Sequence, residues 1–101
     1  AGVPPYGRLV GVVLSSPDAK EAFEVGQAMA RNCQPLTDIG AQIFGPAPAP
    51  IARIRGRHRV RLLIKAEKNA PIQAALRAWT ALFKLPNSLR LSIDIDPQSF
   101  Y

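Results

Sequence analysis

The sequence predicts an α+β domain with the ferredoxin-like, split βαβ order of elements β-α-β-β-α-β. Two observations support this fold class. Four apolar segments that are β-branched or alternating indicate strands, and two segments whose apolar residues recur with the helical period indicate helices. Right-handed crossovers would place both helices on one face of a four-stranded, mainly antiparallel sheet, and the other face would stay open.

The first strand is expected at residues 8–15, "RLVGVVLS", because this segment is apolar and rich in valine. A helix should follow and end near Cys33, since Ser16 can cap it and Pro17 suits its first position. Its apolar stripe would consist of Ala22, Phe23, Met29, Ala30 and Cys33.

A second strand is expected at residues 38–44, "DIGAQIF", which alternates apolar and polar residues and ends before Gly45. The prolines that follow lack amide donors and should hold the chain extended. A third strand is placed at residues 58–65. We therefore expect residues 45–59 to form a projecting Pro-rich and Arg-rich arm, bent at Gly56, on a single domain of residues 1–101.

The second helix has the strongest periodicity in the sequence. Its apolar positions are Ile72, Ala75, Leu76, Trp79, Leu82 and Phe83. Asn69 can cap this helix, Pro71 lies in its first turn, and Trp79 is expected to pack in the core. The last strand, residues 90–96, alternates so that one side is polar and faces outward. These polar residues are Arg90, Ser92, Asp94 and Asp96.

The net charge of +6 is concentrated in one short segment. Of the 13 bases, six lie within residues 53–65 without any acid, and the rest of the chain balances seven bases against seven acids. The six are Arg53, Arg55, Arg57, Arg59, Arg61 and Lys65. Such clustering favours contact with a phosphate backbone over a solvated edge strand. The run contains no Asn or Gln suited to a base edge, so the contact should not depend on base sequence.

Other function classes find little support. The single cysteine, Cys33, cannot form an internal disulfide, His58 lacks further metal ligands nearby, and no metal site is expected. No phosphate-binding loop is present, so we expect no catalytic residues in this segment. The absence of a signal peptide or membrane span favours a cytoplasmic protein. Because the chain begins at Ala1 without Met, we expect a piece of a longer protein.

Three stretches, "PPYGR" (4–8), "GPAPAPIARIRGRHRVRLLIKA" (45–66) and "LSIDIDPQSF" (91–100), resemble the C-terminal domain of the replication-restart helicase family PriA, or primosomal protein N-prime. The resemblance implies a fold like that of a small-subunit ribosomal protein. It also implies binding of forked or single-stranded DNA and cooperation with other primosome proteins. No cofactor is expected in this segment, whereas ATP, magnesium and zinc are expected in a parent 3′ to 5′ DNA helicase.

The resemblance further implies a docking site for the acidic tail of the single-stranded-DNA-binding protein. The family's glutamine contact for that tail matches Gln73, whereas a nearby arginine contact falls at Asn69, beside Lys68. Lys68 and Gln73 are therefore the expected partner-binding residues. The open sheet face, with Leu9, Val13 and Leu63, is expected to pack on the rest of the helicase chain, in a bacterial, nucleoid-associated setting.

Two alternatives remain. A ribosomal-type RNA-binding protein would share the fold and the basic segment, but a base-stacking sheet needs aromatic residues on its central strands, and residues 8–15 and 59–65 contain none. A small enzyme or ligand-sensing regulator on the same fold would need a nucleophile or base in a cleft, and the sequence shows no such constellation.

Overall fold

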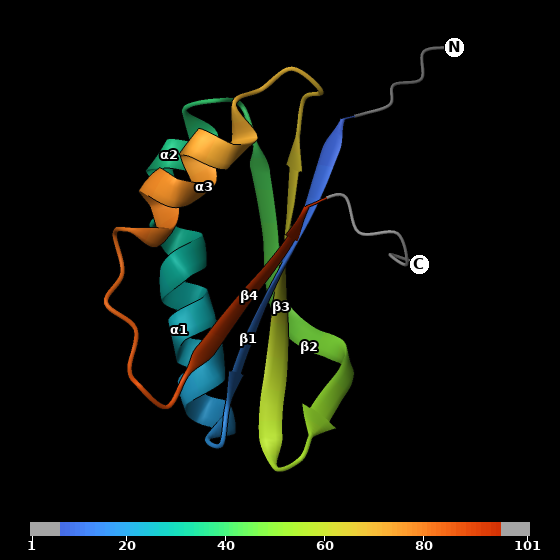
Figure 1. Ribbon diagram of the computed structural model, residues 1–101, viewed down its shortest axis with the longest axis vertical. Coiled ribbons are helices and arrows are strands. Elements are labelled where there is room, and N and C mark those ends of the chain that lie inside the picture. The colour runs from blue at the N-terminus through green and yellow to red at the C-terminus, as the bar shows by residue number, and fades with distance from the viewer. Residues whose placement is uncertain (1–6, 96–101) are drawn as a thin grey trace.

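The computed structural model describes residues 7–95 and contains a four-stranded antiparallel sheet with helices packed on it (Figure 1). The strands are β1 (Arg8–Ser16), β2 (Gln42–Ile54), β3 (Arg57–Ala66) and β4 (Arg90–Ile95). The helices are α1 (Ala19–Arg31), α2 (Gln34–Thr37) and α3 (Ile72–Thr80). The strand order is β2-β3-β1-β4. The predicted α+β class is confirmed; Asp96, expected in the last strand, lies outside the described residues.

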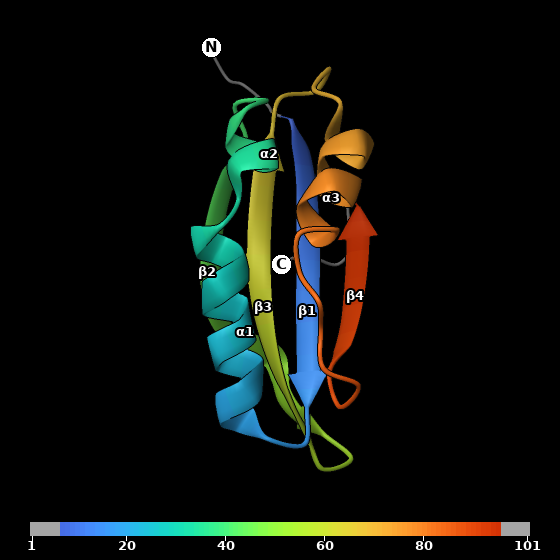
Figure 2. The same cartoon turned by 90° about the vertical axis from the view of Figure 1, so that its left-hand side faces the viewer.

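The helices cover one face of the sheet, and the hydrophobic core lies between the two layers (Figure 2). Alternate residues of the central strands point into this core because successive side chains of a strand face opposite sides. The fully buried side chains include Val10, Val12, Leu14, Leu62 and Ile64 from the strands and Met29, Leu36, Ile72 and Trp79 from the helices. Trp79 packs in the core, as predicted, and its indole Nε1 donates a hydrogen bond to the Met29 carbonyl at 2.9 Å.

Both long helices begin with caps that differ from those expected. Asp18 caps α1 by accepting a hydrogen bond from the Lys20 amide, whereas Ser16 ends β1 and its Oγ accepts from the Asp18 amide. The α3 N-cap is Pro71, without a side-chain hydrogen bond, so the predicted cap at Asn69 is wrong. The helix ends at Thr80, before Leu82 and Phe83, which were expected on its apolar face, although Phe83 still packs edge-on against Trp79.

The second strand is longer and begins later than predicted. Residues 38–40 form a turn, and β2 continues through the prolines to Ile54. An edge strand tolerates proline because one of its sides needs no amide donors. The pairing with β3 shifts between Phe44 and Ala47 and again between Pro48 and Arg53, so β2 is bulged where the prolines lie.

Gly45 and Gly26 allow this bulged strand to lie close to its neighbours. Gly45 has a φ of 108°, and a Cβ at this position would lie 2.7 Å from the Arg61 carbonyl oxygen. The Gly45–Pro46 peptide bond is cis. A Cβ on Gly26 of α1 would lie 3.0 Å from the Cβ of Pro46. The proline segment therefore packs beneath α1 instead of leaving the sheet.

Candidate nucleic-acid interface

The β2–β3 hairpin ends in a two-residue turn, Arg55-Gly56, whose φ angles are 52° and 78°. Positive φ at both positions is typical of the type I′ turn that closes tight hairpins. Ser16, the last residue of β1, is opposite His58, so the hairpin tip (residues 53–57) extends past the end of β1 (Figure 1). The expected arm at residues 45–59 thus lies mostly within the sheet, and only this tip projects.

Arg53 and Arg55 carry the charge of the hairpin tip. Both are exposed, and within residues 7–95 neither guanidinium group has a hydrogen-bond or ion-pair partner. No acidic residue occurs in β2 or β3. The two side chains are therefore available to an external anion.

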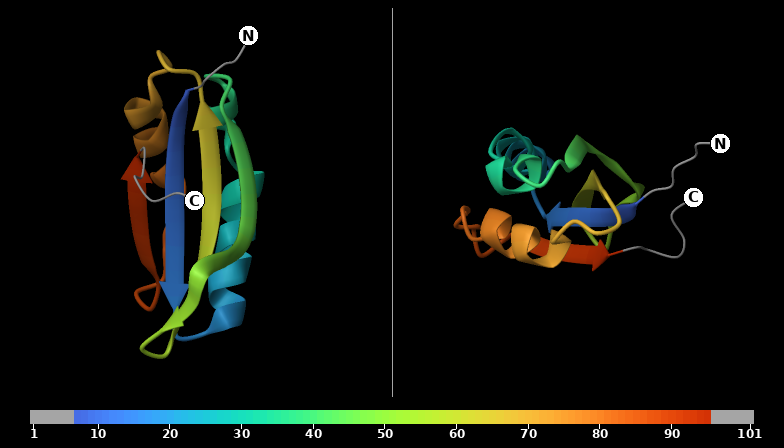
Figure 3. Two further views of the ribbon diagram at one scale, coloured as in Figure 1. Left: turned by 90° about the vertical axis from the view of Figure 1, so that its right-hand side faces the viewer. Right: turned by 90° about the horizontal axis from the view of Figure 1, so that it is seen from above.

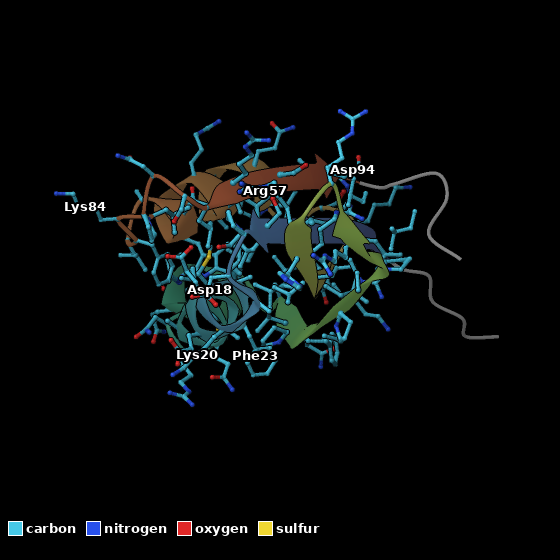
Figure 4. The ribbon with its side chains drawn as sticks, turned by 90° about the horizontal axis from the view of Figure 1, so that it is seen from below. Asp18, Lys20, Phe23, Arg57, Lys84 and Asp94 are labelled. Atoms are coloured by element: carbon cyan, nitrogen blue, oxygen red, sulfur yellow. The ribbon has the colours of Figure 1, made fainter. Side chains whose placement is uncertain are left out.

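Arg57 has an internal role that the charge pattern of the sequence does not indicate. Its guanidinium group donates to the Ser15 hydroxyl (3.2 Å), the Ser15 carbonyl (2.8 Å) and the Ser88 carbonyl (2.7 Å). The side chain is half-buried and connects the end of β1 with the segment before β4 (Figure 4). Most of its hydrogen-bonding capacity is used inside the domain.

The contacts of Arg57 belong to a larger polar group, here called the Arg57 cluster, formed by Ser15, Ser16, Glu21, Arg57 and Ser88. Oε1 of Glu21 accepts hydrogen bonds from the hydroxyls of Ser16 (2.6 Å) and Ser88 (2.8 Å). The cluster thereby joins α1, β1, the start of β3 and the segment before β4. Because β3 begins within this cluster, the base of the hairpin is fixed relative to the rest of the domain.

The other predicted cations lie along β3 on the open face of the sheet, which the helices leave uncovered (Figure 3). Arg59 is half-buried and donates from Nη1 to the Ile51 carbonyl, in the bulged part of β2, at 2.8 Å. Arg61 is half-buried and already interacts within the protein, whereas Lys65 is exposed. The six predicted cations therefore do not form one uniform row.

The open face also carries apolar residues. Leu9, Val13 and Leu63 are half-buried there, and Phe44 of β2, opposite Leu63, is 45% exposed. Arg90, Ser92 and Asp94 of β4 are exposed and lie opposite β1, in agreement with their predicted outward orientation. Phe44 was not among the predicted site residues, although the polar Gln42 two residues earlier, on the same face of the strand, indicates an outward side chain.

The predicted partner-binding residues lie near α3, at the end of the domain away from the hairpin tip (Figure 1). Gln73 is exposed and helps to line a shallow pocket of about 320 Å³ with Arg8 and Arg77. Lys68 is exposed but does not line this pocket, and Asn69 lies in the turn before the helix. The two arginines were not among the predicted partner-binding residues, because they come together with Gln73 only in the folded chain.

Within residues 7–95, no group of three or more His, Cys, Asp or Glu side chains is arranged to hold a metal ion. His58, at the start of β3, is half-buried. Over the same residues, no helix is both long and apolar enough to cross a membrane.

Comparison with known proteins identifies the family of this chain. The model of the primosomal protein N C-terminal domain matches residues 1–98. The replication restart protein PriA of Rickettsia felis is 37% identical over 101 residues, which are all of this chain and 15% of that protein. The PriA of Synechocystis is 35% identical over 96 residues, 95% of this chain and 11% of that protein. The Bacillus subtilis PriA is 28% identical over 97 residues, 93% of this chain and 12% of that protein. The chain, which spans only a small part of these relatives, belongs to the primosomal protein N C-terminal domain family.

Proposed function

We propose that this domain is the DNA-binding and docking module of a replication restart protein. In this proposal the hairpin tip contacts phosphates of branched or single-stranded DNA. Family membership supports the role in replication restart. The observation that carries the DNA contact is the pair of exposed guanidinium groups of Arg53 and Arg55 at a projecting end of the sheet, which have no partner among residues 7–95.

The backbone of Arg55 provides independent support. A left-handed conformation, here with φ of 52°, costs an L-residue roughly 1–2 kcal/mol, and type I′ turns favour Asn, Asp or Gly. Backbone outliers of this kind cluster at functional sites. A cation at a position where Asn, Asp or Gly would cost less is better explained by a binding role than by solubility alone.

The basic residues of the β2–β3 hairpin differ in how available they are to DNA. Arg53 and Arg55 at the hairpin tip meet the phosphates first, and Arg59, Arg61 and Lys65 supply further positive charge on the open face of β3. Arg57 stabilises the base of the hairpin through the Arg57 cluster and does not contact DNA. Phosphate contacts carry no sequence information, so binding should tolerate any base sequence and weaken with salt.

Fluorescence anisotropy with forked and single-stranded DNA at several salt concentrations tests this proposal. Each lost phosphate contact makes the slope of log K against log salt less steep by about 0.7 for a single strand. The slope of the Arg53→Ala/Arg55→Ala variant should therefore be less steep than that of the wild type by about 1.4. The matched control is Lys20→Ala/Lys84→Ala, which removes the same charge from exposed residues on the helix side (Figure 4). Equal slopes for the two variants would contradict the proposal, and preferential binding of structured RNA would favour the ribosomal-type alternative.

We assign partner docking to the opposite end of the domain. Gln73, Arg77 and Arg8 line a shallow pocket whose cations and amide suit the acidic tail of the single-stranded-DNA-binding protein. A labelled acidic peptide with a free terminal carboxylate should bind less tightly to the Gln73→Ala and Arg77→Ala variants. Lys68→Ala should have a smaller effect because Lys68 lies outside the lining. Wild-type affinity of Gln73→Ala would refute this assignment.

The remaining functions belong to the longer protein of which this domain would be a part. By similarity to the PriA relatives, that protein would be an ATP-dependent 3′ to 5′ DNA helicase that acts with other primosome proteins in the bacterial cytoplasm. ATP, magnesium and zinc would bind outside this domain. The domain itself would bind DNA and partner proteins and would catalyse no reaction.

A further inference from the structure

Phe44 is an exposed aromatic side chain on the open face of the sheet. It lies in β2 opposite Leu63, on the side that the helices leave uncovered, and 45% of its surface is exposed. The ammonium group of Lys65 lies over the ring, 5.5 Å from its centroid. Because β2 is an edge strand of the sheet that residues 7–95 form, no other strand of this described part hinders access to the ring from that side.

The position of Phe44 connects it with the proposed phosphate contacts. Arg59, Arg61 and Lys65 alternate along β3 and share the open face with Leu63. From Arg57 to Leu63 the strand advances six residues, or roughly 20 Å, at about 3.3 Å per residue. A nucleic-acid strand that leaves the hairpin tip and follows β3 would reach the ring of Phe44 within a few nucleotides.

The charges around Phe44 favour a polyanion over a protein surface. Neither strand of the hairpin contains an acidic residue, and the nearest cation, Lys65, is exposed and long enough to reach a phosphate beside the ring. Single-strand binding surfaces combine cations that follow the backbone with aromatic rings on which bases stack. Both components are present here on one face.

We propose that Phe44 is a stacking site for an unpaired base of single-stranded DNA, with Lys65 contacting the adjoining phosphate. The proposal rests on the proposed function and adds that the domain distinguishes single strands from duplex. In duplex DNA the bases are already stacked on each other, so the phosphate contacts remain but the ring gains no partner. Every base has a stacking face, so this contact is also independent of sequence.

Two oligonucleotides of equal length separate stacking from phosphate contact. Oligo-dT offers bases and phosphates, whereas an abasic strand of the same length offers the phosphates alone. Phe44→Leu keeps an apolar side chain but removes the aromatic ring. It should bind oligo-dT about 5- to 150-fold more weakly than the wild type and the abasic strand equally well. Circular dichroism of each variant checks that the fold is intact.

Phe44→Trp gives a direct signal of stacking. The only native tryptophan, Trp79, is fully buried, so a change in fluorescence on binding reports on position 44. Oligo-dT should quench this fluorescence and the abasic strand should not.

Wild-type affinity of Phe44→Leu for oligo-dT, or a Phe44→Trp fluorescence unaffected by oligo-dT, would overturn the stacking site. A different result would show that Arg53 and Arg55 do not contact phosphates. In that case Arg53→Ala/Arg55→Ala would bind the abasic strand as well as the wild type does, whatever the result for Phe44.

Discussion

Replacing Arg57 by alanine should destabilise the domain, although the residue belongs to the arginine run. The substitution removes three hydrogen bonds, to the Ser15 hydroxyl, the Ser15 carbonyl and the Ser88 carbonyl. A hydrogen bond contributes about 0.5–1.5 kcal/mol net, and these acceptors, being partly accessible, regain water when the donor is lost. We therefore expect the free energy of unfolding to fall by about 2–3 kcal/mol, a large part of the roughly 5–15 kcal/mol of a typical domain.

Urea unfolding followed by the fluorescence of buried Trp79 measures this loss. Two further variants serve as controls. Arg59→Ala removes one exposed hydrogen bond, to the Ile51 carbonyl, and should cost less than about 1 kcal/mol. Arg57→Lys keeps the charge but lacks the planar guanidinium group, so it should lose most of the stabilisation.

Two outcomes would refute the structural role of Arg57. Arg57→Ala could prove as mild as Arg59→Ala, which would mean that the hydrogen bonds to Ser15 and Ser88 contribute nothing. Alternatively, Arg57→Lys could match the wild type, which would mean that charge alone matters.

Three other substitutions test the backbone and the core by the same unfolding measurement. Arg55→Asn suits the left-handed turn position better and should raise the stability by about 1 kcal/mol while weakening DNA binding; an unchanged or lower stability would contradict the assigned strain. Gly45→Ala should lower the free energy of unfolding by about 2 kcal/mol or more, because the new Cβ would lie 2.7 Å from the Arg61 carbonyl oxygen and the φ of residue 45 is 108°. An unchanged stability would contradict this packing. Trp79→Phe leaves the Met29 carbonyl without its buried donor and should lower the free energy of unfolding by about 1–3 kcal/mol. Because this variant lacks tryptophan, its unfolding is followed by circular dichroism. A smaller loss of stability would argue against this hydrogen bond.

The sequence predicted the features that depend on local periodicity. The apolar spacing around Trp79 identified a helix and its buried face as far as Trp79, whereas Leu82 lies beyond the helix and is exposed. The alternation along residues 58–65 placed Arg61 and Lys65 on the face opposite the core. Both patterns repeat within a few residues, so no knowledge of distant segments was needed.

The errors concern features that depend on neighbours distant in sequence. Prolines end a central strand but not an edge strand, and the sequence does not reveal that β2 lies at the edge. The partners of Arg57 are 42 and 31 residues away, so its internal hydrogen bonds could not be inferred from the charge pattern. Likewise, the pocket beside Gln73 forms only when Arg8 approaches α3.

In our proposal Arg53 and Arg55 contact phosphates, whereas Arg57 stabilises the fold. NMR spectra of the arginine Nε–H groups, recorded while an abasic DNA strand is added, distinguish these two roles. We predict that the signals of Arg53 and Arg55 shift with added DNA, and that the Arg57 signal stays in place and is protected from solvent exchange from the start. A shift of the Arg57 signal without any change at Arg53 and Arg55 would show that these roles are wrongly assigned.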